Sequence, residues 1–154
     1  MFLQVVLVLI GIGALSVLLW EPHLEGRNAN ATTFQIYFND PFLAYAYLSS
    51  VAFFTALYQA FKLLGQIGRD QVFSADSVKA LRIIKYCAIF LVGAIGAADA
   101  YLFLAVRGKD DIAGGVAMGL VMMFLFIVIA SAAAVFEKLL QSAVEMKSEN
   151  DLTV

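Results

Sequence analysis

The sequence predicts an all-α integral membrane protein, a four-helix bundle with its N- and C-termini in the cytoplasm. Three observations support this fold class. Of the 154 residues, 62% are hydrophobic and 14% are charged, whereas soluble domains are about 45–50% apolar and about 25% charged. The mean hydropathy is +0.88, and one small core cannot bury so much apolar surface. Finally, four separate stretches are long enough to cross about 30 Å of hydrocarbon.

The four spans are expected at residues 2–20, 42–65, 84–106 and 111–136. Each is continuously apolar rather than alternating, which indicates helices rather than the strands of a barrel. We interpret the first stretch as a retained span and not a signal peptide, because no Lys or Arg precedes its apolar run. Residues 1–136 are therefore expected to form one transmembrane domain.

The orientation follows from the basic residues, which favour the cytoplasmic side in short connections. Seven of the ten lie in the tail or in the region where the second span ends and the third begins, and three lie in the other connections. The seven are Lys62, Arg69, Lys79, Arg82, Lys85, Lys138 and Lys147, and the three are Arg27, Arg107 and Lys109. This asymmetry predicts a cell-membrane protein with cytoplasmic termini.

The connection between the first two spans, residues 21–41, is the larger feature on the outer side. Apolar residues alternate there at Phe34, Ile36 and Phe38. Such alternation is typical of a short strand, or of an amphipathic lid that lies on the bundle.

A helix is expected to begin after Ser74 and to lead into the third span; we call its first turns, through Lys85, the elbow helix. Ser74 is a favourable N-cap, and Asp76 lies in the first turn, where the helix dipole favours an anion. Phe73 and Val78 occupy the positions of a hydrophobic staple.

The elbow helix has an apolar side and a basic side. The apolar side comprises Val78, Leu81 and Ile84, and the basic side comprises Lys79, Arg82 and Lys85. This pattern is typical of an interfacial segment whose apolar residues dip into the membrane and whose basic residues contact lipid headgroups or a partner. Enforcement of topology is the favoured interpretation of the basic side, and sensing of anionic lipid is the alternative.

The last span is expected to continue as a cytoplasmic helical tail over residues 137–154, because residues 121–154 contain no Gly or Pro. An apolar stripe follows the helical period at Phe136, Leu139, Leu140, Ala143 and Met146. A helix with such a stripe needs a partner for it. The candidates are the elbow helix of the same chain, a second copy in a homo-oligomer, and a different protein.

Two segments carry a family resemblance. "FSADSVKALRIIKY" and "AVEMKSENDLTV" resemble an uncharacterised family of small bacterial four-span membrane proteins, known only as a domain of unknown function. Members of that family are often encoded beside a small helix-turn-helix regulator. The resemblance implies that the cytoplasmic face holds such a regulator at the membrane, and it implies no enzymatic residues.

Asp99 is an isolated acid within the third span. A charge at that depth is costly, so the side chain should face the bundle or water. Tyr47, Ser49 and Ser50 of the second span lie at a similar predicted depth, and their hydroxyls can donate hydrogen bonds. The favoured interpretation is a structural hydrogen-bond centre, and the alternative is an ion, proton or ligand site.

These features favour a membrane-anchored regulatory or binding protein that acts through its elbow helix and tail. The alternative is an oligomeric ion or proton channel or transporter that uses Asp99. No enzyme is expected, because the sequence has no H-E-x-x-H or G-x-S-x-G motif and no paired intramembrane acids. Cys87 stands alone, so neither a metal nor another cofactor is expected. A net charge of −2 gives no reason to expect direct binding of nucleic acid.

Overall fold

The computed structural model describes residues 2–20, 32, 41–106 and 112–152 of the chain. Four α-helices account for most of them: α1 (Phe2–Trp20), α3 (Pro41–Ile67), α4 (Ala75–Tyr101) and α5 (Ala113–Leu152). A short π-helix, η3 (Leu102–Val106), follows α4 directly. The all-α prediction is confirmed, since the described part of the chain contains no strand. The short strand or amphipathic lid predicted from residues 34–38 lies outside the described residues.

All four α-helices are long and apolar enough to cross a membrane. The first two match the predicted spans to within two residues at each end. The last helix has 40 residues, so at 1.5 Å per residue it is about 60 Å long, roughly twice the thickness of the hydrocarbon core. The predicted helical extension of the last span is therefore confirmed, and α5 runs without a break through residue 136.

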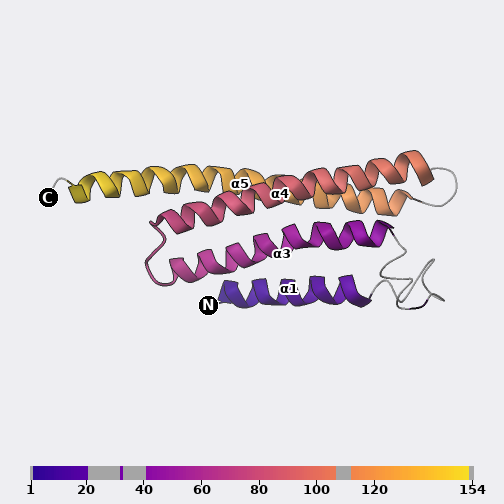
Figure 1. Cartoon of the computed structure of the whole chain (residues 1–154), viewed down its shortest axis with the longest axis horizontal. Coiled ribbons are helices and arrows are strands. Elements are labelled where there is room, and N and C mark those ends of the chain that lie inside the picture. Colours follow the sequence, from indigo (N-terminus) through magenta and orange to yellow (C-terminus); the bar gives the residue numbers. More distant parts are fainter. Residues whose placement is uncertain (1, 21–31, 33–40, 107–111, 153–154) are drawn as a thin grey trace.

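The helices pack side by side in chain order, each antiparallel to the one before (Figure 1). The largest interface joins α4 to α5, the next joins α3 to α4, and the smallest of the three joins α1 to α3. At one end α1 begins, α3 ends, α4 begins and α5 projects beyond its neighbours (Figure 1). We call this the basic end, because all seven basic residues predicted to be cytoplasmic belong to the helix segments and the turn located there.

The small protein core is centred on α4. Its buried apolar residues recur every three or four positions, so they occupy one side of the helix. They are Val78, Ala80, Leu81, Ile84, Ala88, Leu91 and Ala94, and Ala133 of α5 is buried as well. By contrast, α1 buries no residue. Exposed apolar helix surface is unfavourable in water but favourable in contact with lipid. In lipid, the association of helices depends on close packing rather than on the hydrophobic effect.

The elbow helix differs from its prediction in one respect. The elbow helix does lead into the third span as expected, because it forms the first turns of α4. Its apolar residues Val78, Leu81 and Ile84 are buried by protein rather than inserted into the membrane. The reason is that α3 and α5 both pack against α4, and they cover that side of the helix.

Candidate functional site

An apolar pocket of about 350 Å³ opens at the basic end, where α3 ends, α4 begins and α5 leaves the bundle. Three parts of the chain line it. They are Leu63 and Ile67 of α3, Val72, Phe73 and Leu81 of the turn and α4, and Phe136, Leu139 and Leu140 of α5. The pocket therefore brings the elbow region and part of the predicted tail stripe together in one surface.

Hydrogen bonds hold the turn that forms one wall of this pocket. The Ser74 hydroxyl accepts a hydrogen bond from the Ser77 backbone N–H at 3.3 Å, which confirms the predicted N-cap. Ser77 is fully buried, and its hydroxyl donates to Gln66 Oε1 of α3 at 2.8 Å. Asp70 adopts a φ of 56°, a left-handed conformation that Asp tolerates better than most residues. These contacts fix the start of α4 relative to the end of α3.

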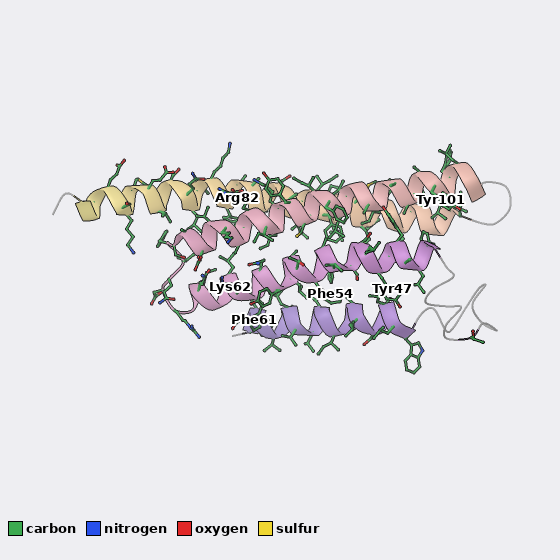
Figure 2. All side chains as sticks on the ribbon, viewed as in Figure 1. Tyr47, Phe54, Phe61, Lys62, Arg82 and Tyr101 are labelled. Carbon is green, nitrogen blue, oxygen red and sulfur yellow. The ribbon has the colours of Figure 1, made fainter. Side chains whose placement is uncertain are left out.

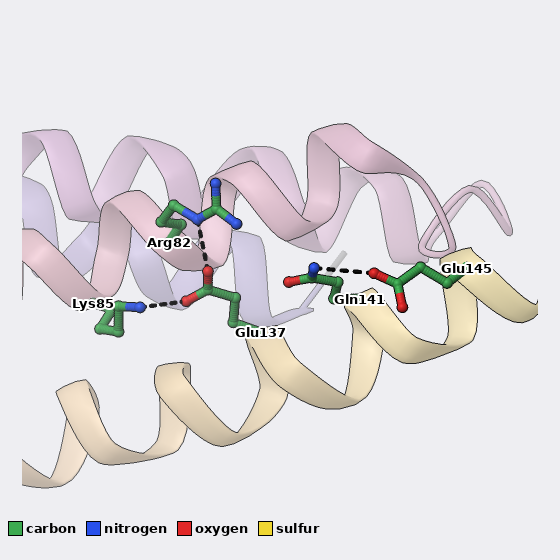
Figure 3. A network of polar contacts seen from close by, with 5 residues as sticks. All are labelled: Arg82, Lys85, Glu137, Gln141 and Glu145. Atoms are coloured by element: carbon green, nitrogen blue, oxygen red, sulfur yellow. Dashed lines mark hydrogen bonds and ion pairs between the residues drawn. The ribbon is translucent and has the colours of Figure 1, made fainter.

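Glu137 attaches α5 to α4 beside the pocket (Figure 3). Its carboxylate accepts from Arg82 Nε at 2.7 Å and from Lys85 Nζ at 2.6 Å, and Glu137 itself is only 6% exposed. A buried carboxylate is costly unless it is paired, and here two cations from successive turns of α4 pair with it. The adjacent residue, Phe136, lines the pocket, so this cluster also positions the start of the tail.

The two cations differ in how far they are withdrawn from solvent. The Arg82 side chain is 50% exposed and that of Lys85 is 21% exposed. Lys85 Nζ also lies 4.8 Å from the centre of the Tyr86 ring, within the range of a cation–π contact. With two positive charges and one negative charge, the cluster keeps a net positive charge.

Sequence reasoning missed Glu137 and assigned Arg82 and Lys85 to headgroups or a partner. A usable clue was present, because Glu137 is the first acid after Asp111 and directly follows the last predicted span. An antiparallel pairing of the last two spans brings that position level with residues 82–85. Lys79, the third residue of the predicted basic side, is exposed and makes no ion pair with any described residue.

The tail stripe divides into two parts. Phe136, Leu139 and Leu140 line the pocket, whereas Ala143 and Met146 lie further along α5. The start of α4 and the preceding turn of the same chain therefore face the first part. Leu139 is still 62% exposed and Met146 is 64% exposed, so these contacts leave most of the stripe uncovered.

Asp99 lies at a close approach between α4 and α5. Its carboxylate occupies the space beside Gly119, where a β-carbon would overlap both carboxylate oxygens. Nearby, a β-carbon at Gly96 would lie 3.3 Å from Met123 Sδ. Small residues permit this approach, as is common between membrane helices. Asp99 Oδ2 is buried and has no hydrogen-bond partner among the described residues.

Two of the three hydroxyls expected near Asp99 have other acceptors. Tyr47 of α3 donates to the Leu18 carbonyl of α1 at 3.0 Å (Figure 2), and Ser50 donates to the Tyr47 carbonyl at 2.7 Å. Ser49 is half-buried and makes no side-chain hydrogen bond to another described residue. These hydroxyls therefore do not donate to Asp99, and the expected hydrogen-bond centre is corrected in this respect.

Tyr45 is the tyrosine of α3 that reaches α4, since its hydroxyl donates to the Ala94 carbonyl at 2.7 Å. Residues two apart on a helix point about 200° apart. Tyr45 and Tyr47 therefore point towards different helices on opposite sides of α3. Their similar depth in the membrane did not distinguish these two directions.

Four apolar spanning helices, a small core centred on α4 and a polar cluster at one end define a small helical integral membrane protein. A family model described as "Protein of unknown function (DUF2975)" matches residues 24–154, and the chain belongs to that family. It is 42% identical over 154 residues to the "Uncharacterized membrane protein YoaS" of Bacillus subtilis (strain 168), covering 99% of this chain and 96% of that protein. No solved structure matches the chain significantly.

Proposed function

We propose that this membrane protein binds a cytoplasmic protein partner through the pocket at its basic end, and so acts as a membrane-anchored binding or regulatory protein. The observation that supports this proposal is the pocket itself, which is lined by eight apolar side chains from α3, the turn, α4 and α5. An apolar pocket at the polar end of a membrane protein, beside exposed cations, needs a cover other than water.

The occupant that fits best is the apolar side of an amphipathic helix. The pocket lies beside the projecting part of α5, so a helix laid along α5 meets the pocket at one end and Met146 at the other. Helices bind in this way through anchors spaced three, four and seven residues apart. The exposed Lys79 and Arg82 lie near the same end and complement acidic residues flanking such anchors.

A crosslinking experiment on the full-length protein in intact cells identifies the partner. A photoreactive amino acid replaces Phe73, which lines the pocket and is 54% exposed, and a control replaces Phe124, which is 65% exposed on the spanning part of α5. We expect a protein adduct at position 73 that is absent at position 124. Adducts with lipid alone at both positions would contradict the proposal.

Binding of the purified partner to the full-length protein in nanodiscs then tests the pocket. Leu139→Glu places a charge in the pocket lining, and Met146→Glu places the same charge on the same helix outside it. We expect the first substitution to weaken binding at least tenfold, and by more than the second. Equal effects would show that the partner recognises α5 without using the pocket.

Conduction through an oligomer is the second candidate, and the unpartnered Asp99 Oδ2 is the observation that favours it. Proton or cation flux into liposomes is compared between the native protein and Asp99→Asn. Flux that disappears in the variant would support conduction, whereas equal flux, or none in either, would remove the role of Asp99.

A further inference from the structure

The exposed side of α4 changes from basic to apolar within three turns. Lys79 and Arg82 are exposed at its start, followed by Tyr86, which is 61% exposed. Ile89 and Phe90 then follow at 53% and 55% exposed. Steps of three and four residues place all five on one side of the helix. This side thus presents cations, then an aromatic residue with a polar tip, then apolar residues, in the order of a membrane's headgroup, interface and acyl layers.

The cations on this side are not fully used by Glu137. Arg82 engages Glu137 through Nε, and neither of its two terminal nitrogens makes a hydrogen bond to a described residue (Figure 3). A guanidinium has five N–H donors in a fork that matches a phosphate group. Lys79 lies one turn before Arg82 and adds a second positive charge to the net charge of the cluster. The exposed edge of the cluster therefore presents N–H donors and positive charge to an anionic ligand.

We propose that Lys79 and Arg82 bind the headgroup phosphate of an anionic phospholipid, whose acyl chain lies along Ile89 and Phe90. An inorganic phosphate would satisfy the cations alone. A lipid also covers the apolar residues that continue along the same side of α4, and Tyr86 stands at the boundary between the two layers. The pocket of the proposed function lies on the buried side of α4, where Leu81 lines it. The two sites share only Lys79 and Arg82, so Leu139→Glu tests the pocket without changing the lipid site.

Lipid binding to the full-length protein in detergent tests this site, by native mass spectrometry and by the shift of the unfolding temperature. The probes are phosphatidylglycerol and phosphatidylcholine with identical acyl chains. We expect phosphatidylglycerol to bind more tightly and to stabilise more. Because one basic residue near an anionic lipid contributes about fivefold in affinity, Lys79→Gln should weaken phosphatidylglycerol binding about fivefold.

Two further variants separate the site from general surface charge. Lys138→Gln removes an exposed cation at the same end from α5 instead of α4, and we expect it to leave binding nearly unchanged. Arg82→Lys retains the charge but loses the fork, so it should weaken binding. The Lys79→Gln variant keeps both ion pairs of Glu137, so a folding defect from a lost ion pair does not obscure its result.

Three outcomes would overturn the proposal. The first is equal binding of the two lipids, and the second is a loss in Lys138→Gln as large as that in Lys79→Gln. The third is stabilisation by inorganic phosphate equal to that by phosphatidylglycerol, which would identify the ligand as free phosphate.

Discussion

Replacing Gly119 with alanine is expected to weaken the interface between α4 and α5. The added β-carbon would overlap both oxygens of the Asp99 carboxylate, so either the carboxylate must leave its rotamer or the two helices must separate. Gly93→Ala is a matched control within a helix, because a β-carbon at Gly93 meets no atom within 4 Å.

The magnitude follows from opposing effects. Overpacking a close contact costs about 1–3 kcal/mol, and replacing a helical glycine with alanine recovers up to about 1 kcal/mol. Gly119→Ala should therefore lower the free energy of unfolding by about 1–2 kcal/mol. Gly93→Ala should leave this free energy unchanged or raise it slightly. Because Asp99 is the obstacle, Gly119→Ala should cost almost nothing in an Asp99→Ala background.

The assay is reversible unfolding of the full-length protein in mixed micelles, followed by circular dichroism, for the two single variants and the double variant. The double-mutant cycle should give a coupling energy of about 1–2 kcal/mol between positions 99 and 119. An additive result would refute the reasoning, because the cost of Gly119→Ala would then not arise from the Asp99 carboxylate. The same conclusion would follow if Gly119→Ala behaved like Gly93→Ala.

Three other experiments test the basic end and the topology. Glu137→Gln should lower the free energy of unfolding by about 1–3 kcal/mol, because it removes two ion pairs whose cations are only partly buried. Glu145→Gln, on the exposed tail, should leave this free energy unchanged. Equal effects would show that the ion pairs of Glu137 do not stabilise the fold. Ser77→Ala should cost about 1–2 kcal/mol in the same assay, since it leaves a glutamine amide of α3 without its donor; an unchanged stability would show that the turn does not depend on this bond. Cysteines introduced at Lys79 and Arg107, in a background lacking the native cysteine, should react with a membrane-impermeant thiol reagent from opposite sides; reaction from one side would disprove the predicted topology.

The four helices could be predicted from the sequence because lipid imposes a simple requirement. A spanning segment must be apolar over about 20 residues and must satisfy its own backbone, and both properties are local. The first span was therefore predicted at residues 2–20, as observed. The N-cap at Ser74 and the extension of α5 were also correct, because capping and helix termination depend on neighbouring residues.

The partners of polar side chains could not be predicted in the same way. Depth in the membrane suggested Tyr47 near Asp99, but a hydroxyl is directed by the rotation of its helix, and Tyr47 faces α1 while Tyr45 reaches α4. The basic residues of α4 pointed to lipid, yet Arg82 and Lys85 also pair with Glu137.

The sequence by itself determined that this protein is a membrane protein with four helices, where those helices lie, and which residues interrupt their apolar surfaces. Only the tertiary structure decided which helix faces meet, and with them the pocket at the basic end, the pairing of Glu137 and the place of Asp99 beside Gly119. The physical reason is that hydropathy and capping act along one helix. Contacts between helices depend on how each helix is rotated about its axis and on the register of the pair. Most of the helix surface here is apolar, so it favours no particular rotation or register strongly.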